Sequence, residues 1–217
     1  MNGENTTNAS REPPLPTDPH RVVLTGENPF IRLSPSDGAE ESCVASFWSI
    51  LFCSAGPGHV LYYRSEMTDG QWRIYSDNIA MTRWLQDTVQ GMLDASLKDT
   101  SIPVIDAAFS KSGDPAYFWT ETIMSAEEEI TMTWHDLGDP LLVHTMPDEI
   151  PGRDYGVCTV LIPAAGARLT HNGCRPPASP GRERATAGLS ARAPWPSPKA
   201  GPRRGRAAPR GISPQWA

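Results

Sequence analysis

Apolar and polar residues alternate in short runs along most of this chain, with the period of two that is typical of β-strands. The run over 43–53 differs, because both of its faces are apolar, as in a strand that is buried on two sides. Turn-forming sequences such as Thr68-Asp69-Gly70 separate the runs. The pattern predicts strands over 21–25, 43–53, 59–64, 71–75, 102–109, 116–124, 129–135, 141–145, 157–162 and 168–171.

One segment, from about residue 77 to 98, has helical periodicity instead. Its apolar residues lie three and four positions apart and predict one long amphipathic helix. Either Ser76 or Asp77 is expected to cap the first turn, and Pro103 prevents any continuation. The apolar stripe consists of Met81, Trp84, Leu85, Val89, Met92 and Leu93.

The order of these elements predicts the fold class. Strands and helices do not alternate along the chain, which excludes a doubly wound parallel sheet. We expect a mostly β protein of the α+β kind, in which an antiparallel barrel or sandwich of short strands carries the helix over one end or one face.

Composition divides the chain into three parts. Residues 1–20 contain four prolines and few apolar residues, so we expect this segment to be disordered. Residues 21–173 form one predicted globular domain. From residue 174 to 217 the residues Arg, Pro, Ala and Gly dominate, and this tail is also expected to be disordered.

The boundary between the domain and the tail is unusual. Asn172-Gly173 is a strong signal for a type I′ hairpin turn, which should return the chain as a paired strand. The next residues include Pro176, Pro177 and Pro180, which cannot donate to a ladder, so no ordinary return strand is expected. Two explanations stay open: a reading frame lost after Gly173 in a GC-rich gene, or a genuine disordered basic tail.

Charge is distributed unevenly along the chain. The first 164 residues hold nine basic and 24 acidic side chains, whereas ten of the 19 basic residues lie from Ala165 onward. The acidic body argues against nucleic acid and anionic lipid as partners. No apolar segment reaches the roughly 20 residues that cross a bilayer, and residues 1–20 lack an apolar secretory core. We therefore expect a soluble cytoplasmic protein whose four cysteines are thiols.

Two carboxyl groups fall on predicted inner faces of strands. Asp106 alternates with Ile102, and Glu121 alternates with Trp119 and Ile123. Burial would raise the pKa of each carboxyl unless a partner compensates for it. A buried carboxyl among aromatic side chains is one way for a β-barrel to build a general acid or base. The ordinary alternatives are an outward-facing carboxyl or one that a neighbouring side chain satisfies.

A third candidate for acid–base chemistry is His135, in the densest group of potential ligands, at 134–144. This group also contains Asp136, Asp139 and His144 around a Gly-Asp-Pro turn. The spacing matches none of the compact metal signatures, so we predict no metal site and no cofactor. Alternation points His135 away from the face that holds Trp134, which makes ordinary surface chemistry the alternative.

Three aromatic residues, Tyr117, Trp119 and Trp134, are candidates for lining a ligand site, although large aromatic residues on strands usually belong to the core. No nucleophile elbow, Walker, dinucleotide-binding or zinc-protease motif is present. The first hypothesis is therefore a β-barrel or sandwich that holds a small, largely apolar molecule.

Two other function classes stay open. One is a cofactor-independent enzyme on the same scaffold, which would use Glu121 or Asp106 with a nearby histidine. The other is a protein-interaction module that binds through a sheet edge or through the tail. An enclosed cavity that holds either carboxyl would favour a binding protein or an enzyme, whereas a filled interior would favour the interaction module.

Overall fold

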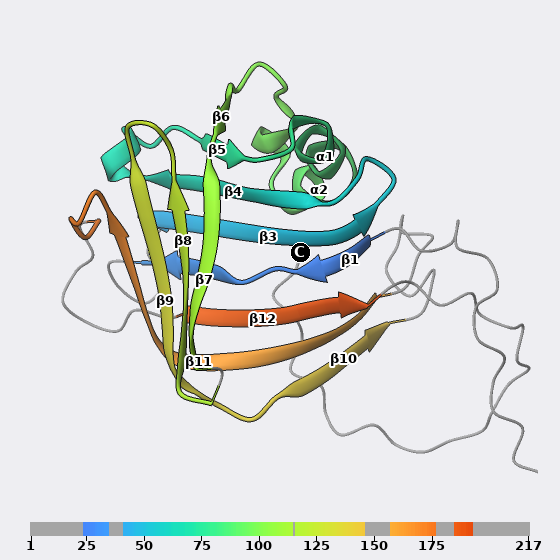
Figure 1. The fold of residues 1–217 in the computed structure, drawn as a ribbon, viewed down its shortest axis with the longest axis vertical. Coiled ribbons are helices and arrows are strands. Elements are labelled where there is room, and N and C mark those ends of the chain that lie inside the picture. Colours follow the sequence, from blue (N-terminus) through green and yellow to red (C-terminus); the bar gives the residue numbers. More distant parts are fainter. Residues whose placement is uncertain (1–23, 35–40, 115, 146–156, 177–184, 193–217) are drawn as a thin grey trace, which may run out of the picture.

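The computed structural model describes residues 24–34, 41–114, 116–145, 157–176 and 185–192, and for 143–145, 157–159 and 185–192 it describes the backbone alone. These residues form a mostly β protein with two sheets and one helix of 15 residues, which confirms the predicted fold class (Figure 1). The strands are β1 (Leu24–Glu27), β2 (Phe30–Leu33), β3 (Cys43–Cys53), β4 (Gly58–Ser65), β5 (Arg73–Ser76), β6 (Val104–Asp106), β7 (Ala108–Asp114), β8 (Phe118–Met124), β9 (Glu129–Leu137), β10 (Leu141–Thr145), β11 (Val157–His171) and β12 (Ala185–Arg192).

The first sheet curls into a half-barrel. Its strands pair in the order β6-β5-β4-β3-β1-β12-β11-β10, and β2 pairs with both β3 and β12. All of these pairs are antiparallel except β5 with β6. The second sheet pairs β7, β8, β9 and the last part of β11, all antiparallel.

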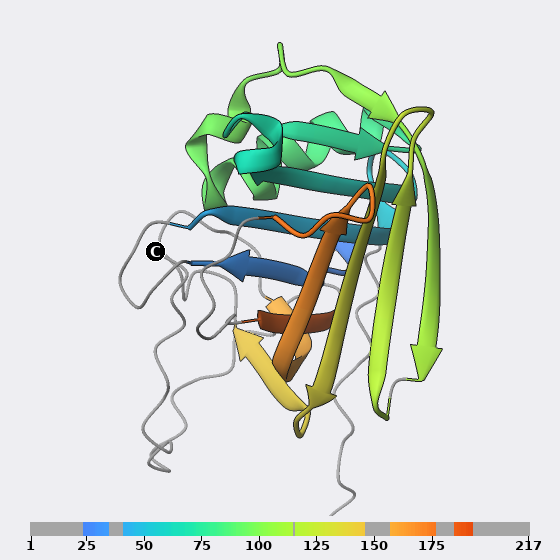
Figure 2. The same cartoon turned by 90° about the vertical axis from the view of Figure 1, so that its left-hand side faces the viewer.

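Two segments carry the chain from one sheet to the other. Residues 158–163 of β11 pair with β12, and residues 164–171 of the same strand pair with β9. On the opposite border, Ala107 alone separates β6, which pairs with β5, from β7, which pairs with β8. The two sheets are therefore joined along both borders, and their strands run across one another (Figure 2).

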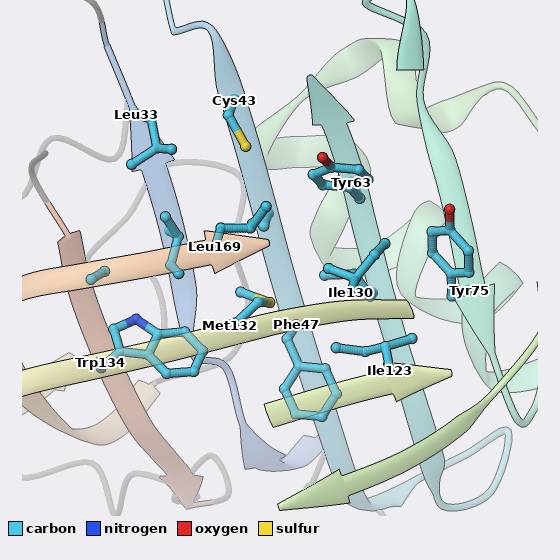
Figure 3. Close-up of a cluster of buried hydrophobic side chains, with 14 of the residues drawn as sticks. Leu33, Cys43, Phe47, Tyr63, Tyr75, Ile123, Ile130, Met132, Trp134 and Leu169 are labelled. Atoms are coloured by element: carbon cyan, nitrogen blue, oxygen red, sulfur yellow. The ribbon is translucent and has the colours of Figure 1, made fainter. Parts of the chain in front are cut away.

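The main hydrophobic core lies between the two sheets (Figure 3). The half-barrel contributes one face of β3 and β4, including Phe47 and Leu61, and the second sheet contributes Ile123 and Trp134. The alternation predicted for 116–124 and 129–135 is confirmed by these inward-facing residues. Because core side chains pack together here, the space inside the half-barrel is occupied by protein.

A second hydrophobic cluster lies on the outer face of the half-barrel. Trp48 and Ile50 of β3 and Tyr62 of β4 pack there against the helix residues Met81 and Leu85. Strand β3 is thus buried on both faces, as its two-sided apolar pattern predicts.

The helix comprises α1 (Ile79–Leu85), a π-helical turn η3 (Gln86–Gln90) and α2 (Gly91–Leu93). The helix lies where it was predicted, but the prediction of its N-cap residue is wrong. Asn78, rather than Ser76 or Asp77, accepts the hydrogen bond from the backbone N–H of Met81, at 3.1 Å. Ser76 lies two residues before Asn78. Its hydroxyl accepts the backbone N–H of Asn78 and so helps to hold the capping residue in place. The described residues also form two short 3₁₀ helices, η2 (Glu66–Thr68) and η4 (Ala95–Lys98).

The predicted hairpin turn after β11 is present. Asn172 and Gly173 both have positive φ, 50° and 75°, as a type I′ turn requires. The returning chain makes one bridge, between His171 and Cys174, and no paired strand follows within the described residues up to 176. No return strand follows the turn directly, as predicted, but the chain does return further on, because β12 (Ala185–Arg192) pairs antiparallel with β11.

The structure also differs from the prediction in several strands. The strand β2 was not predicted, and the predicted strands 157–162 and 168–171 are one continuous strand, β11. Within the tail that we expected to be disordered, residues 185–192 form β12. Composition misses this strand because its backbone pairs with β1 and β11 on its two sides, which does not require an apolar sequence. Residues 1–23, 177–184 and 193–217 lie outside the described part, so disorder there stays a prediction.

A chain that ends at residue 176 is expected to unfold at lower temperature than the full chain, because removal of β12 exposes unpaired edges of β1 and β11. The melting temperature by circular dichroism checks this, together with the association state by light scattering. A chain that ends at residue 192 is the control and should melt like the full chain. Equal melting temperatures for all three chains would contradict the placement of β12.

One carboxylate ties three segments together at one end of the core. Glu128 lies in the turn between β8 and β9. It accepts the hydroxyl of Tyr75 at 2.6 Å, contacts Nε2 of His171 at 3.1 Å and forms an ion pair with Arg73. Burial alone would raise the pKa of Glu128, but the hydrogen bond from Tyr75 and the charge of Arg73 outweigh it and lower the pKa.

Because the folded state lowers the pKa of Glu128, its carboxylate stabilises the fold above the pKa of the unfolded chain and loses this effect as the pH falls. Glu128→Gln is therefore expected to lower the free energy of unfolding at pH 7 by about 1–3 kcal/mol. The difference from the parent protein should shrink below about pH 4. Urea unfolding at both pH values measures it, with the exposed Glu129→Gln as control; a deficit independent of pH would refute this assignment.

Candidate functional site

A row of polar residues crosses four neighbouring strands at the mouth of the half-barrel. Glu27 of β1 is paired in register with Ser49 of β3, and Ser49 is paired with His59 of β4. His59 in turn bonds to Asp77, the residue that follows β5. Paired residues on neighbouring strands share one face of a sheet. This face is the one that carries Phe47 two residues before Ser49, so the row continues the core face toward solvent.

The imidazole of His59 is held in one orientation. Its Nδ1 lies 2.7 Å from Oδ2 of Asp77, and its backbone N–H donates to Oδ1 of the same carboxylate at 2.6 Å. The ring packs against Phe47 and Phe109, with centroid distances of 6.2 and 5.2 Å and nearly parallel planes, and these two phenylalanine rings also contact each other at 5.7 Å. Gly58 allows the close approach of Asp77, because a Cβ there would lie 2.8 Å from Oδ1.

The second ring nitrogen of His59, Nε2, has no hydrogen-bond partner within the described part of the chain, and the side chain is 39% exposed. Because a carboxylate can only accept, the proton of a neutral imidazole lies on Nδ1 toward Asp77. Nε2 then carries a lone pair that is available to a bound molecule.

His59 and Asp77 line an open cleft of about 760 Å³. The cleft lies where β3 and β5 end and where β4 and α1 begin, and Asp106, at the end of β6, completes its polar lining. The apolar part of the lining includes Leu51 and Ile79, which are 70% and 61% exposed. The cleft thus combines accessible apolar side chains with a small number of polar groups.

A second set of charged groups lies behind this row. Nζ of Lys111, on β7, is 2.5 Å from Oε2 of Glu27 and 3.7 Å from Oε1 of Glu121, so it bridges the two sheets. The ammonium also lies 4.3 Å from the centre of the Trp119 ring. At 3.7 Å the contact with Glu121 is too long for a hydrogen bond, and no described residue satisfies Oε1 of Glu121 or Nε1 of Trp119.

Glu121 is buried, as its alternation with Trp119 and Ile123 predicts. Burial raises the pKa of this carboxyl to about 7; the charge of Lys111 opposes the rise, and the carboxylate of Glu27 adds to it. The carboxyl is surrounded by the main core and is not part of the cleft lining. A catalytic role for Glu121 stays a prediction.

The prediction that Asp106 is buried is wrong, because this residue is exposed. The sequence pattern treats 102–109 as one strand, whereas β6 ends at Asp106 and the chain changes sheets at Ala107. Ala107 is buried in place of its neighbour. The structure nevertheless brings Asp106 together with His59 and Asp77 in the cleft, which no local pattern predicts.

The other predicted site residues lie elsewhere. His135 is exposed and contacts Oδ2 of Asp136 at 2.9 Å. Trp119 and Trp134 are core residues in edge-to-face contact at 5.9 Å. Tyr117 is 71% exposed, in the turn between β7 and β8. The side chain of His144 lies outside the described residues.

Sequence reasoning missed the residues of the polar row and Lys111. Gly58-His59 reads as part of a turn, and Asp77 reads as a helix cap. Their common location depends on the register of four strands, and only the strand pairing supplies it.

Comparisons with known proteins do not indicate a function, so the function is inferred from the geometry of the site. No protein-family model matches the chain, and no curated protein matches it. In the part of the chain that the structure describes, no helix has the length and apolar character to span a membrane. Nor do the described residues include a group of three His, Cys, Asp or Glu side chains arranged to hold a metal ion.

Glu121→Gln is expected to raise stability progressively between about pH 4.5 and pH 7, compared with the parent protein. The folded state keeps Glu121 neutral to higher pH than the unfolded chain does, so ionisation of the unfolded chain favours unfolding over this range. Above pH 7 the difference should level off at about 3 kcal/mol. Urea unfolding across the range measures it, with the exposed Glu66→Gln as control. A difference that does not change with pH would show that the carboxyl is not held neutral.

Proposed function

We propose that this protein binds a small organic molecule with an apolar body in the cleft, and that His59 provides the polar contact that orients it. One observation carries the proposal: an imidazole held by Asp77 and packed against two phenylalanine rings lines the same cleft as exposed apolar side chains. A fixed hydrogen-bonding group gives up little conformational freedom on binding, which favours affinity.

The size and chemistry of the cleft support this function. Small-molecule sites are typically about 300–1,000 Å³, with apolar walls and a small number of positioned polar groups. The cleft has a volume of about 760 Å³, with Leu51, Pro57 and Ile79 among its apolar residues. The ligand would lie at the mouth of the half-barrel, because core side chains occupy the interior that the sequence predicted as the binding place.

The two other function classes have less support. An enzyme that uses Glu121 needs this carboxyl within about 2.6–3.2 Å of its substrate, and Glu121 lies in the core behind Lys111 rather than on the cleft. A filled interior is what we expected of an interaction module. However, the outer edge of β7 carries Lys111 and ends in a glycine and an aspartate, features that discourage pairing with another strand.

The experiment uses phenylbutanol, a neutral probe with an apolar body and one hydroxyl. Titration into the isotope-labelled full chain, followed by two-dimensional NMR, is expected to shift the amide signals of residues 57–59 and 77–79. His59→Phe keeps the aromatic stacking but removes the acceptor Nε2, and it should weaken binding about two- to tenfold.

A matched pair of truncations tests the apolar wall. Ile79→Ala should weaken phenylbutanol binding about fivefold. Met92→Ala, at an exposed position outside the cleft near the end of the same helix, should leave it unchanged. If phenylbutanol shifts no amide of the cleft, or if both truncations have the same effect, the proposed function is wrong.

A further inference from the structure

We propose that the ligand of the cleft is a cation, most simply an amine or quaternary ammonium compound with an apolar body. This inference rests on the proposed function, because it names the class of molecule that the same cleft would take. It follows from the kinds of polar group that the lining presents.

Apart from the hydroxyl of Ser49, which can donate or accept, the free polar side chains among the described lining residues accept hydrogen bonds or carry negative charge. The carboxylate of Asp106 is exposed and forms no hydrogen bond or ion pair with any described residue. In the neutral tautomer that donates Nδ1–H to Asp77, the imidazole of His59 presents the lone pair of Nε2. Asn78 offers little to a ligand, since its oxygen accepts from Met81 and its nitrogen donates to the carbonyl of Pro57.

Asp77 adds a second negative charge to the same wall. Both of its oxygens are engaged by His59, through the backbone N–H and through Nδ1. These bonds orient the carboxylate, but they come from neutral groups when the imidazole is neutral, so its charge is not cancelled. A cation in the cleft would therefore lie close to two full negative charges, Asp77 and Asp106.

No basic residue among those described balances these charges. The described residues that line the cleft include neither Lys nor Arg. Lys111 lies behind the row, where Glu27 holds its ammonium at 2.5 Å. The start of the helix at Ile79 contributes a positive field, but one equivalent to only roughly half an elementary charge. The net field in the cleft is thus negative.

The apolar lining determines the rest of the ligand. Leu51 and Ile79 are both exposed in the lining of the cleft, one near the end of β3 and the other at the start of α1. An inorganic cation would leave these side chains in water, whereas an alkyl or aryl group attached to an ammonium would cover them. The combination therefore favours an organic cation over a metal ion.

Three probes with one apolar body test this directly: phenylbutylamine, phenylbutanol and phenylbutanoate. At neutral pH the first is a cation, the second is neutral and the third is an anion. NMR titrations of the full chain, followed at the amides of residues 57–59, 77–79 and 106, give a dissociation constant for each probe. We expect the amine to bind most tightly and the carboxylate most weakly, with about two- to fivefold between the amine and the alcohol at low salt.

Asp106→Asn is expected to remove most of the advantage of phenylbutylamine while leaving the affinity for phenylbutanol unchanged. Asp69→Asn is the matched control, because it changes the net charge by the same amount at an exposed position outside the cleft. It should leave both affinities unaltered.

The outcomes separate this inference from the proposed function. Equal affinities for the three probes, or a preference for phenylbutanoate, would overturn the cation inference while leaving a ligand-binding cleft. Loss of the amine preference in Asp69→Asn as well as Asp106→Asn would also overturn it, because the preference would then reflect net charge alone. If none of the probes shifts a cleft amide, the proposed function fails together with this inference.

Discussion

The burial of β3 on both of its faces is the constraint on which the rest of the structure depends. One face, with Phe47, belongs to the core between the two sheets, and the other, with Trp48 and Ile50, lies under the helix. A shift of one residue in its register would exchange the two sets of side chains, so the register of β3 with its neighbours is strongly specified. This register determines that Glu27, Ser49 and His59 form one row.

The polar row is a consequence of where the burial of β3 ends. Residues Leu51 and Phe52 near the end of β3 are exposed, and the neighbouring strands β4 and β5 begin or end at the same level. Backbone and side-chain polar groups there can be satisfied by one another or by a ligand, whereas those deeper in the strands are satisfied by the ladders. The candidate site therefore lies at the border between the two hydrophobic clusters and solvent, where β3 emerges between them.

Two acidic side chains of the core, Glu121 and Glu128, have opposite effects on stability. Glu121 is buried without a hydrogen bond to Oε1, and Lys111, which could neutralise it, is closer to Glu27. A buried carboxyl in this state reduces stability progressively as the pH rises from about 4.5 to 7, and the full loss remains above pH 7. The Glu128 cluster at the other end of the core is the reverse case, because Tyr75, Arg73 and His171 satisfy that carboxylate. The two acids therefore differ in protonation. The fold raises the pKa of Glu121 and keeps its carboxyl neutral, whereas it lowers the pKa of Glu128, whose charged carboxylate has three stabilising partners.

Local periodicity determined a large part of this structure by itself. The two-sided burial of β3, the helix, the type I′ turn at Asn172-Gly173 and the inward direction of Glu121 all follow from residues close together in the sequence. Periodicity specifies which side of an element is apolar, and it needs no knowledge of the partner.

The tertiary structure alone decided which strands pair and where their ends meet. Asp106 is exposed because the chain changes sheets at Ala107, and β12 forms because β1 and β11 offer backbone groups on both sides. The candidate site depends on the same long-range pairing, since His59, Asp77 and Asp106 come from three strand ends that are distant in the sequence. Side-chain alternation along one strand carries no information about the neighbouring strand, which is why the sequence predicted the core but not the cleft.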